Sequence, residues 1–156
     1  MIEIGMGFQL FSNSFADGGW IPELHTCRGA DLSPSLEWSG EPAGTRSFAL
    51  IVEDPDAPMG IWCHWLLYDL APQVHNLAQG YKPGALGVSG RNDFGKRGYG
   101  GPCPPKGKPH RYFFKLYALS EPSLGLAPGV SRKELVSGIK GHVLGETQYL
   151  GWFQQN

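Results

Sequence analysis

The sequence predicts a mainly β domain built from short strands and tight turns. Its 156 residues include 23 glycines and 13 prolines, while only 17% are charged. That composition suits strands separated by turns and fits poorly with a helical bundle. The length is that of one domain with a sizeable core, so we expect a single domain over residues 1–156.

Four apolar runs have the length and composition of strands. Clusters of Gly, Pro and Asn separate them, as turns between strands require. The third run is apolar at nearly every position, which is typical of a strand buried on both faces, in the centre of a sandwich or of a helix-covered sheet. The runs span residues 8–11, 47–52, 62–70 and 112–119.

One helix is predicted near the C-terminus. Ser131 and Glu134 form a capping-box pattern, and apolar residues follow at helical spacing. Gly138 and Gly141 lie within this pattern, and each weakens a helix by about 1 kcal/mol relative to alanine. Residues 147–153 are expected to form a closing strand. The apolar positions assigned to the helix are Leu135, Val136, Ile139, Val143 and Leu144.

Two carboxylates stand at the end of the second strand run. Asp54 and Asp56 follow five apolar residues and Glu53, and a proline comes directly after Asp54 and another two residues after Asp56. Proline disfavours helix in the residue before it and has no backbone donor, so the carboxylates lie at a stiff strand exit. Two interpretations remain open. The carboxylates form an Asx-type turn that accepts only from nearby N–H groups, or they have partners in a polar site.

Three further elements offer site residues. His64 lies inside the most apolar run, where a lone histidine is more often a satisfied core residue than a functional one. Alternation places His110 and Tyr112 on one strand face, either as a pocket wall or as an edge where polar tips reach water. The glycine-rich segment 92–109 can aim backbone N–H groups at an anion. Residues 94–120 contain no acidic residue and six of the 13 basic residues, Lys96, Arg97, Lys106, Lys108, Arg111 and Lys115.

Together these elements predict a binding site for phosphate or sulfate. Imidazoles, a hydroxyl and backbone N–H groups would donate to the anion, while the aspartates would orient the imidazoles and raise their pKa. Phosphate-loop and dinucleotide glycine patterns are absent from the sequence. A metal site of histidines and aspartates lacks the usual ligand spacing, and no nucleophile elbow is present. A thiol dyad of Cys103 and His110 is the remaining catalytic alternative.

The three cysteines, Cys27, Cys63 and Cys103, have no C-x-x-C spacing, which argues against a disulfide scaffold or a zinc finger. One disulfide at most is possible, and Cys27 with Cys103 is the pairing to test. Three reduced thiols are the expectation for a cytosolic protein.

Global properties exclude several classes of partner. The net charge of −1 provides no general attraction to nucleic acid. No run approaches the ~18 apolar residues that a membrane span needs. Residues 1–8 lack the basic start and long apolar stretch of a signal peptide. We therefore expect a cytoplasmic protein with no transmembrane segment, no nucleic-acid partner, and neither metal nor other cofactor.

Several linked motifs occur in order along nearly the whole chain. They are FADG at 15–18, IP at 21–22, SPSLEW at 33–38, PAG at 42–44, DPDAP at 54–58, HW at 64–65, NDFGKRGYGGP at 92–102, PP at 104–105 and HRY at 110–112. Through them the chain resembles the phosphatidylethanolamine-binding protein family, which includes the Raf kinase inhibitor proteins and short bacterial and archaeal relatives.

The resemblance implies a β-sandwich with a large central antiparallel sheet, a smaller sheet and a few peripheral helices. It also implies a non-catalytic protein that binds phosphate-type ligands or phospholipid head groups in an anion pocket. Some relatives inhibit serine peptidases or protein kinases by direct association, and residues 81–89 are the candidate contact segment here. The residues expected to bind the ligand are Asp54, Asp56, Pro58, His64, Gly100, Gly101, Pro104, His110 and Tyr112.

The sequence departs from the family pattern in two places. Eukaryotic relatives tend to carry a C-terminal helix beside the pocket, whereas this chain ends after its predicted closing strand. It therefore looks like the short prokaryotic type, with a more open pocket, and the kinase partners of eukaryotic relatives do not carry over. Cys63 stands where relatives usually have an aromatic residue or a histidine. Resemblance to the short relatives also implies a possible homodimer.

Overall fold

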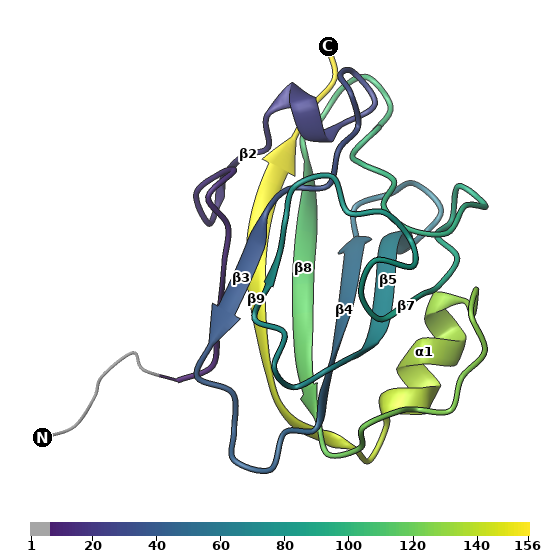
Figure 1. The fold of residues 1–156 in the computed structure, drawn as a ribbon. Helices are drawn as coiled ribbons and strands as arrows, with labels where there is room; N and C mark the ends of the chain where they lie inside the picture. The colour runs from purple at the N-terminus through teal and green to yellow at the C-terminus, as the bar shows by residue number, and fades with distance from the viewer. Residues whose placement is uncertain (1–6) are drawn as a thin grey trace, which may run out of the picture.

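The computed structural model describes residues 7–156 (Figure 1). The expectation that residues 1–8 are not a signal peptide concerns mainly residues 1–6, and these lie outside the described part. The elements in chain order are β1 (Gln9–Phe11), β2 (Gly19–Trp20), the 3₁₀ turn η1 (Glu23–His25), β3 (Leu36–Ser39), β4 (Ser47–Asp54), β5 (Trp62–Leu70), β6 (Asn76–Leu77), β7 (Val88–Ser89), β8 (His110–Leu119), α1 (Arg132–Ile139) and β9 (Val143–Phe153).

The strands form two sheets of unequal size. The larger sheet has six strands in the order β2-β9-β8-β4-β5-β7, and the smaller has three in the order β1-β3-β6. Neighbouring strands run antiparallel except β2 and β9, which pair in parallel. Figure 1 shows the smaller sheet lying across one face of the larger one, while α1 lies away from the smaller sheet. The predicted mainly β sandwich with a large central sheet is confirmed.

The central strands agree closely with the sequence prediction. β5 has the predicted bounds, while β4 and β8 each extend the predicted run by two residues. All eight residues of β4 are buried, as are seven of the nine in β5. Continuous apolar runs form such strands because both of their faces pack against protein.

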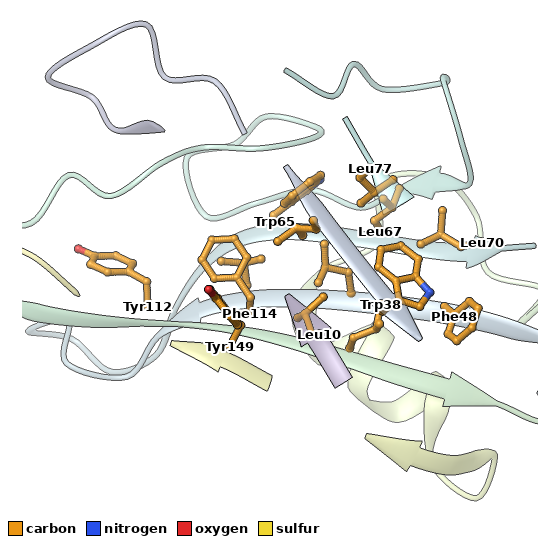
Figure 2. Packing of buried hydrophobic residues seen from close by; sticks show 14 of the residues in the cluster. Leu10, Trp38, Phe48, Trp65, Leu67, Leu70, Leu77, Tyr112, Phe114 and Tyr149 are labelled. Atoms are coloured by element: carbon orange, nitrogen blue, oxygen red, sulfur yellow. The ribbon is translucent and has the colours of Figure 1, made fainter. Parts of the chain in front are cut away.

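Two hydrophobic clusters cover the two faces of the larger sheet. Between the sheets, Leu10 and Trp38 of the smaller sheet belong to one cluster with Phe48, Trp65 and Phe114 of the larger sheet (Figure 2).

The opposite face of the larger sheet packs against the helix. Ile51, Cys63 and Leu66 belong to a second cluster there with Leu135 and Ile139 of α1. The central strands are therefore held from both sides, and their ends are rigid supports for a site.

The helix begins as predicted and ends earlier. Ser131 Oγ accepts from the Glu134 backbone N–H at 3.2 Å, and the Glu134 carboxylate accepts from the Ser131 N–H at 3.0 Å, which completes the capping box. The assignment of Val143 and Leu144 to the helix is wrong, because both lie in β9 with their side chains exposed. Gly141 has a φ of +82°, which takes the chain out of the helical path before it enters β9, the strand that pairs with β8. Within residues 7–156, no helix has the length and apolar character to cross a bilayer.

Candidate functional site

A cavity of about 190 Å³ lies at one end of the larger sheet. Its position follows from strand direction: β4 runs antiparallel to β5 and β8, so the last residue of β4 meets the first residues of both neighbours. A loop over residues 103–105 and an aromatic side chain complete the walls. The lining residues are Asp54, Ala57, Pro58, Trp62, His64, Phe94, Cys103, Pro104, Pro105, His110 and Tyr112.

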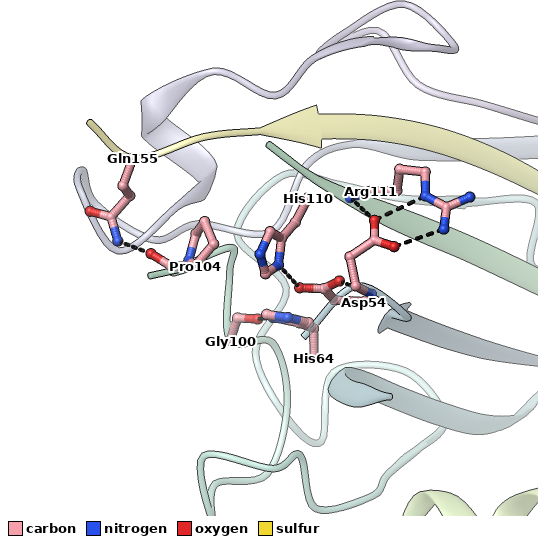
Figure 3. A network of polar contacts seen from close by, with 8 residues as sticks. Asp54, His64, Gly100, Pro104, His110, Arg111 and Gln155 are labelled. Atoms are coloured by element: carbon pink, nitrogen blue, oxygen red, sulfur yellow. Dashed lines mark hydrogen bonds and ion pairs between the residues drawn. The ribbon is translucent and has the colours of Figure 1, made fainter. Parts of the chain in front are cut away.

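Asp54 and His110 form a buried pair on one wall. The Nδ1–H of His110 donates to Asp54 Oδ2 at 2.6 Å, and only 3% of Asp54 and 8% of His110 are exposed (Figure 3). The other carboxylate oxygen, Oδ1, accepts from the Asp56 backbone N–H at 2.7 Å. Asp54 therefore belongs both to an Asx-type turn and to the cavity, so the two interpretations drawn from sequence both apply to it.

His64 reaches the cavity through a β-bulge. In the pairing of β4 with β5, Val52 faces Trp65 and Glu53 faces Cys63, which leaves His64 without a partner in β4. Cys63 packs on the helix side of the sheet and Trp65 on the opposite side. The extra residue shifts the alternation, so that His64 lies on the same side as Trp65 and lines the cavity.

The hydrogen bonding of His64 fixes its tautomer. Its Nδ1 lies 2.6 Å from the Gly100 carbonyl oxygen, and because a carbonyl only accepts, Nδ1 carries the proton. Burial lowers the pKa of His64, and this effect outweighs the attraction of the Asp54 and Asp31 carboxylates. The neutral ring therefore presents the lone pair of Nε2, and the donor role expected from sequence requires a second proton.

Tyr112 supplies a hydroxyl without a partner. Only 1% of this residue is exposed, and its hydroxyl makes no hydrogen bond with any residue of the range 7–156. Burial, then the negative charge of Asp54 and a contact of the hydroxyl with the Asp54 carboxylate, raise the pKa of Tyr112, so the phenol stays protonated. That contact does not have the geometry of a hydrogen bond, so the hydroxyl remains unsatisfied. A buried hydroxyl without a partner costs free energy, and this one belongs to the lining of the cavity. It is a donor available to a ligand.

The sequence predicted that Asp56 orients an imidazole, but in the structure Asp56 pairs with Arg111. Its two oxygens accept from Arg111 Nε at 2.9 Å and Nη2 at 2.7 Å, and the Arg111 backbone N–H also donates to it. This bidentate contact lowers the pKa of Asp56. The expectation that Asp56 orients an imidazole is wrong, because Arg111 alternates with His110 and Tyr112 along β8 and draws Asp56 away from the cavity.

Gly100 and Gly101 stand behind the cavity and are absent from its lining. A Cβ at Gly100 would collide with the Phe94 ring, and one at Gly101 would collide with the His25 carbonyl oxygen. The Gly101 N–H donates to Asp31 Oδ1 at 3.0 Å and is therefore not free for an anion. The glycines serve close packing of the loop, whereas the sequence predicted that their N–H groups face the ligand.

The expectation of three reduced thiols is wrong, because Cys27 and Cys103 form a disulfide. This bond also removes the thiol dyad of Cys103 with His110. Cys63 remains a free thiol, but it is buried on the helix side of the sheet, and desolvation raises its pKa to about 12. It therefore contributes nothing to the cavity wall.

Sequence reasoning missed the aromatic part of the site. Trp62 and Phe94 line the cavity, their rings meet edge to face at 5.5 Å, and Phe94 contacts His64 in the same way. Trp62 could have been found from the sequence, because it lies two residues before His64 in a strand and such residues share a face. Phe94 was hidden in a glycine-rich loop that we interpreted through its backbone. In residues 7–156, no group of three or more His, Cys, Asp or Glu residues is arranged to hold a metal ion.

The two-sheet arrangement places this chain in the class of mainly β sandwich proteins, with a small cavity at the end of the central sheet. The chain belongs to the phosphatidylethanolamine-binding protein family, whose sequence profile matches residues 11–154. Membership in this family supports a role as a binding protein.

Relatives and solved structures agree with this assignment. A UPF0098 protein of Aquifex aeolicus is 46% identical over 156 residues, covering 97% of this chain and 91% of that protein. A UPF0098 protein of Methanothermobacter thermautotrophicus is 43% identical, with coverages of 94% and 99%. The crystal structure of CT736, a homologue of the family from Chlamydia trachomatis, has a TM-score of 0.89 and 38% identity over 97% of this chain and all of that one. Escherichia coli YbcL, described as a member of the mammalian family, also has a TM-score of 0.89, at 36% identity over 96% of this chain and 99% of that one.

Proposed function

We propose that the protein binds a small oxyanion, of the phosphate or phospholipid head-group type, in the cavity beside His64 and His110, and that it does so without catalysing a reaction. The observation that carries this proposal is the Tyr112 hydroxyl, a buried donor with no partner among the described residues. An oxygen atom of a ligand would satisfy this donor and recover the free energy that its isolation costs.

The volume and walls of the cavity support a small ligand group. About 190 Å³ is below the 300–1,000 Å³ typical of drug-sized ligands, so the cavity suits a head group rather than a whole lipid. Trp62, Phe94, Pro58 and Pro104 make its walls largely apolar. The polar residues of the lining, Asp54, His64, His110 and Tyr112, neighbour one another and would fix the orientation of an oxyanion.

The same residues support a non-catalytic role. Asp54 is committed to His110 and to the Asp56 N–H. Cys103 is held in the disulfide, and the Cys63 thiol lies on the other side of the sheet. The free base of the lining, His64 Nε2, is not hydrogen-bonded to the Tyr112 hydroxyl, so the lining holds no nucleophile paired with a base, the arrangement that covalent catalysis requires.

Titration of the protein with inorganic phosphate and with phosphoethanolamine, followed by NMR of the histidine and tyrosine side chains, tests the proposal. We expect saturable shifts at His64 and His110, a loss of affinity of about tenfold in Tyr112→Phe, and a further loss in His110→Ala. Tyr117→Phe is the matched control, because Tyr117 lies in the same strand and packs on the helix side of the sheet. The absence of shifts at millimolar phosphate would overturn the proposal.

We propose inhibition of a serine peptidase or protein kinase as a second candidate function. It is favoured by the loop over residues 82–87, which is exposed throughout while the Tyr81 hydroxyl donates to the Leu86 carbonyl oxygen at 2.6 Å. This bond holds an exposed leucine in place, and a preorganised loop binds a partner with less loss of entropy. Inhibition assays against a panel of peptidases and kinases test this candidate. It requires that Leu86→Ala weakens inhibition and that Val143→Ala, at another exposed apolar site, does not.

A further inference from the structure

The cavity wall over residues 102–105 is unusually poor in hydrogen-bond donors. Three of its four residues are prolines, which have no N–H, so backbone donation from the wall is confined to Cys103. Yet the wall supplies Cys103, Pro104 and Pro105 to the lining of the cavity. The position of the wall must therefore depend on donors that bind its carbonyl oxygens and on the disulfide of Cys103.

Two anchors hold this wall in place. On one side, Gln155 Nε2 donates to the Pro104 carbonyl oxygen at 2.6 Å, next to His110 (Figure 3). On the other side, the Cys27 N–H donates to the Pro102 carbonyl oxygen at 3.1 Å, and the Cys27–Cys103 disulfide joins the same two segments. The disulfide is the one covalent anchor, and it links the wall to the segment that follows η1.

The same segment also supports the acceptor of His64. The Tyr99 hydroxyl donates to the His25 carbonyl oxygen at 2.6 Å, and the Gly101 N–H donates to Asp31. Between these two contacts lies Gly100, whose carbonyl oxygen accepts from His64 Nδ1. Cys103 therefore lies two residues after Gly101, just beyond the end of the segment 99–101, whose Gly100 carbonyl oxygen fixes the tautomer of His64.

Both sulfur atoms belong to residues that a small thiol can reach. Cys27 and Cys103 are exposed, and both line a second cavity of about 280 Å³ that shares Cys103 and Phe94 with the first. Lys96 and Asp31 also line this second cavity, and their opposite charges interact, so the lining does not repel an approaching thiolate as a purely acidic one would. Cys63 is buried in the core on the helix side of the sheet, so it is poorly placed to exchange with either sulfur.

We propose that the Cys27–Cys103 disulfide is a redox latch on the ligand cavity, closed when oxidised and opened by a dithiol reductant. A thiolate of the dithiol attacks one sulfur, the S–S bond breaks, and the other cysteine leaves as a thiolate that takes up a proton. The second thiol of the reductant, as thiolate, then displaces the first cysteine and forms the disulfide of the reductant. Two electrons pass to the protein, and both cysteines end as thiols.

The latch rests on the proposed function, and it predicts a coupling between ligand and redox state. In the reduced protein the wall keeps only its hydrogen bonds to Gln155 and to the Cys27 N–H. It therefore leaves its position more readily, and binding must order it again. Ordering one residue costs about a factor of ten in affinity. Because coupling is reciprocal, saturating ligand must disfavour reduction by the same factor, which is about 30 mV for this two-electron couple.

The first experiment compares phosphate affinity in the oxidised and dithiothreitol-reduced protein by calorimetry, with far-UV circular dichroism to confirm that the sheets persist. We expect reduction to weaken binding about tenfold, and the double variant Cys27→Ser/Cys103→Ser to bind as the reduced protein does in both conditions. Cys63→Ala is the matched control and should respond to reduction as the wild type does. Equal affinity in the oxidised and reduced wild type would overturn the latch.

Two further readouts separate the latch from the proposed function. Hydrogen exchange of the Gly101 and Cys27 amides, which donate to Asp31 and to the Pro102 carbonyl oxygen, must accelerate on reduction in the absence of ligand, while that of β4 does not. Equilibration in dithiothreitol redox buffers must show the midpoint shift on adding phosphate. Unchanged exchange at these amides would overturn the latch even if phosphate binds. An oxidised wild type that fails to bind phosphate would overturn the proposed function, whatever the exchange rates show.

Discussion

Binding of an oxyanion in this cavity should depend on pH through His64. Its ring is neutral and presents a lone pair at Nε2, because Nδ1–H is committed to Gly100 and burial lowers the pKa. A lone pair repels an anion, so binding of an unprotonated anion requires that His64 take up a proton. A bound dianion next to the ring then raises the pKa of His64 relative to the free protein. Proton uptake is therefore linked to binding.

The magnitude follows from this single proton. Between the lowered pKa of the free protein and the raised pKa of the complex, affinity rises about tenfold for each unit by which the pH falls. The ordinary histidine pKa is about 6.5, and the free value lies below it, so a decrease from pH 7.5 to 5.5 should strengthen binding by up to about 100-fold. The gain ends once the pH falls below the pKa of His64 in the free protein.

Sulfate is the appropriate probe, because it does not itself titrate in this range. Calorimetry at half-unit pH intervals, in buffers with different ionisation enthalpies, measures both the affinity and the protons taken up. His64→Gln should abolish most of the slope, since an amide donates at any pH. A flat profile in the wild type would show that no proton is taken up on binding, contrary to this prediction. A slope that survives in His64→Gln and disappears in His110→Gln would assign the proton to the wrong ring and refute it as well.

Three further predictions concern stability and its separation from binding. Tyr112→Phe should leave the free energy of unfolding unchanged or slightly raised, because the hydroxyl is buried without a partner; a loss above about 1 kcal/mol in urea denaturation would contradict this. Arg111→Ala should lower the free energy of unfolding only slightly in urea denaturation, since its ion pair with Asp56 is partly exposed, and should change phosphate affinity less than twofold, as calorimetry would show. Leu135→Ala should lower the free energy of unfolding by about 2–5 kcal/mol without changing affinity, because the side chain is fully buried under the opposite face of the sheet; urea denaturation and phosphate titration measure the two effects.

Strand interiors were predictable because burial dictates their composition. The bounds of β5 could be read from its nearly continuous apolar run, and two-residue alternation correctly placed His110 and Tyr112 on one face of β8. The short strands β3 and β6 escaped prediction because four and two residues carry too little periodicity.

Features that depend on tertiary pairing were not predictable in the same way. Asp56 was paired with the wrong neighbour because a bidentate arginine is a stronger partner than an imidazole, and the sequence does not show which of them reaches it. Cys27 and Cys103 are separated by 76 residues, and only the folded loop brings them together. Val143 and Leu144 fitted a helical period, but Gly141 redirects the chain into the sheet first.

The β-bulge at His64 has a consequence for comparing proteins of this fold. Since His64 has no partner in β4, removing it would leave a ladder in which Val52 and Glu53 face consecutive residues of β5. A chain that lacks one residue at this point would therefore keep its sandwich and lose its imidazole. The length of this strand segment, rather than overall identity, is therefore the feature to compare when asking whether a protein of this fold carries the imidazole.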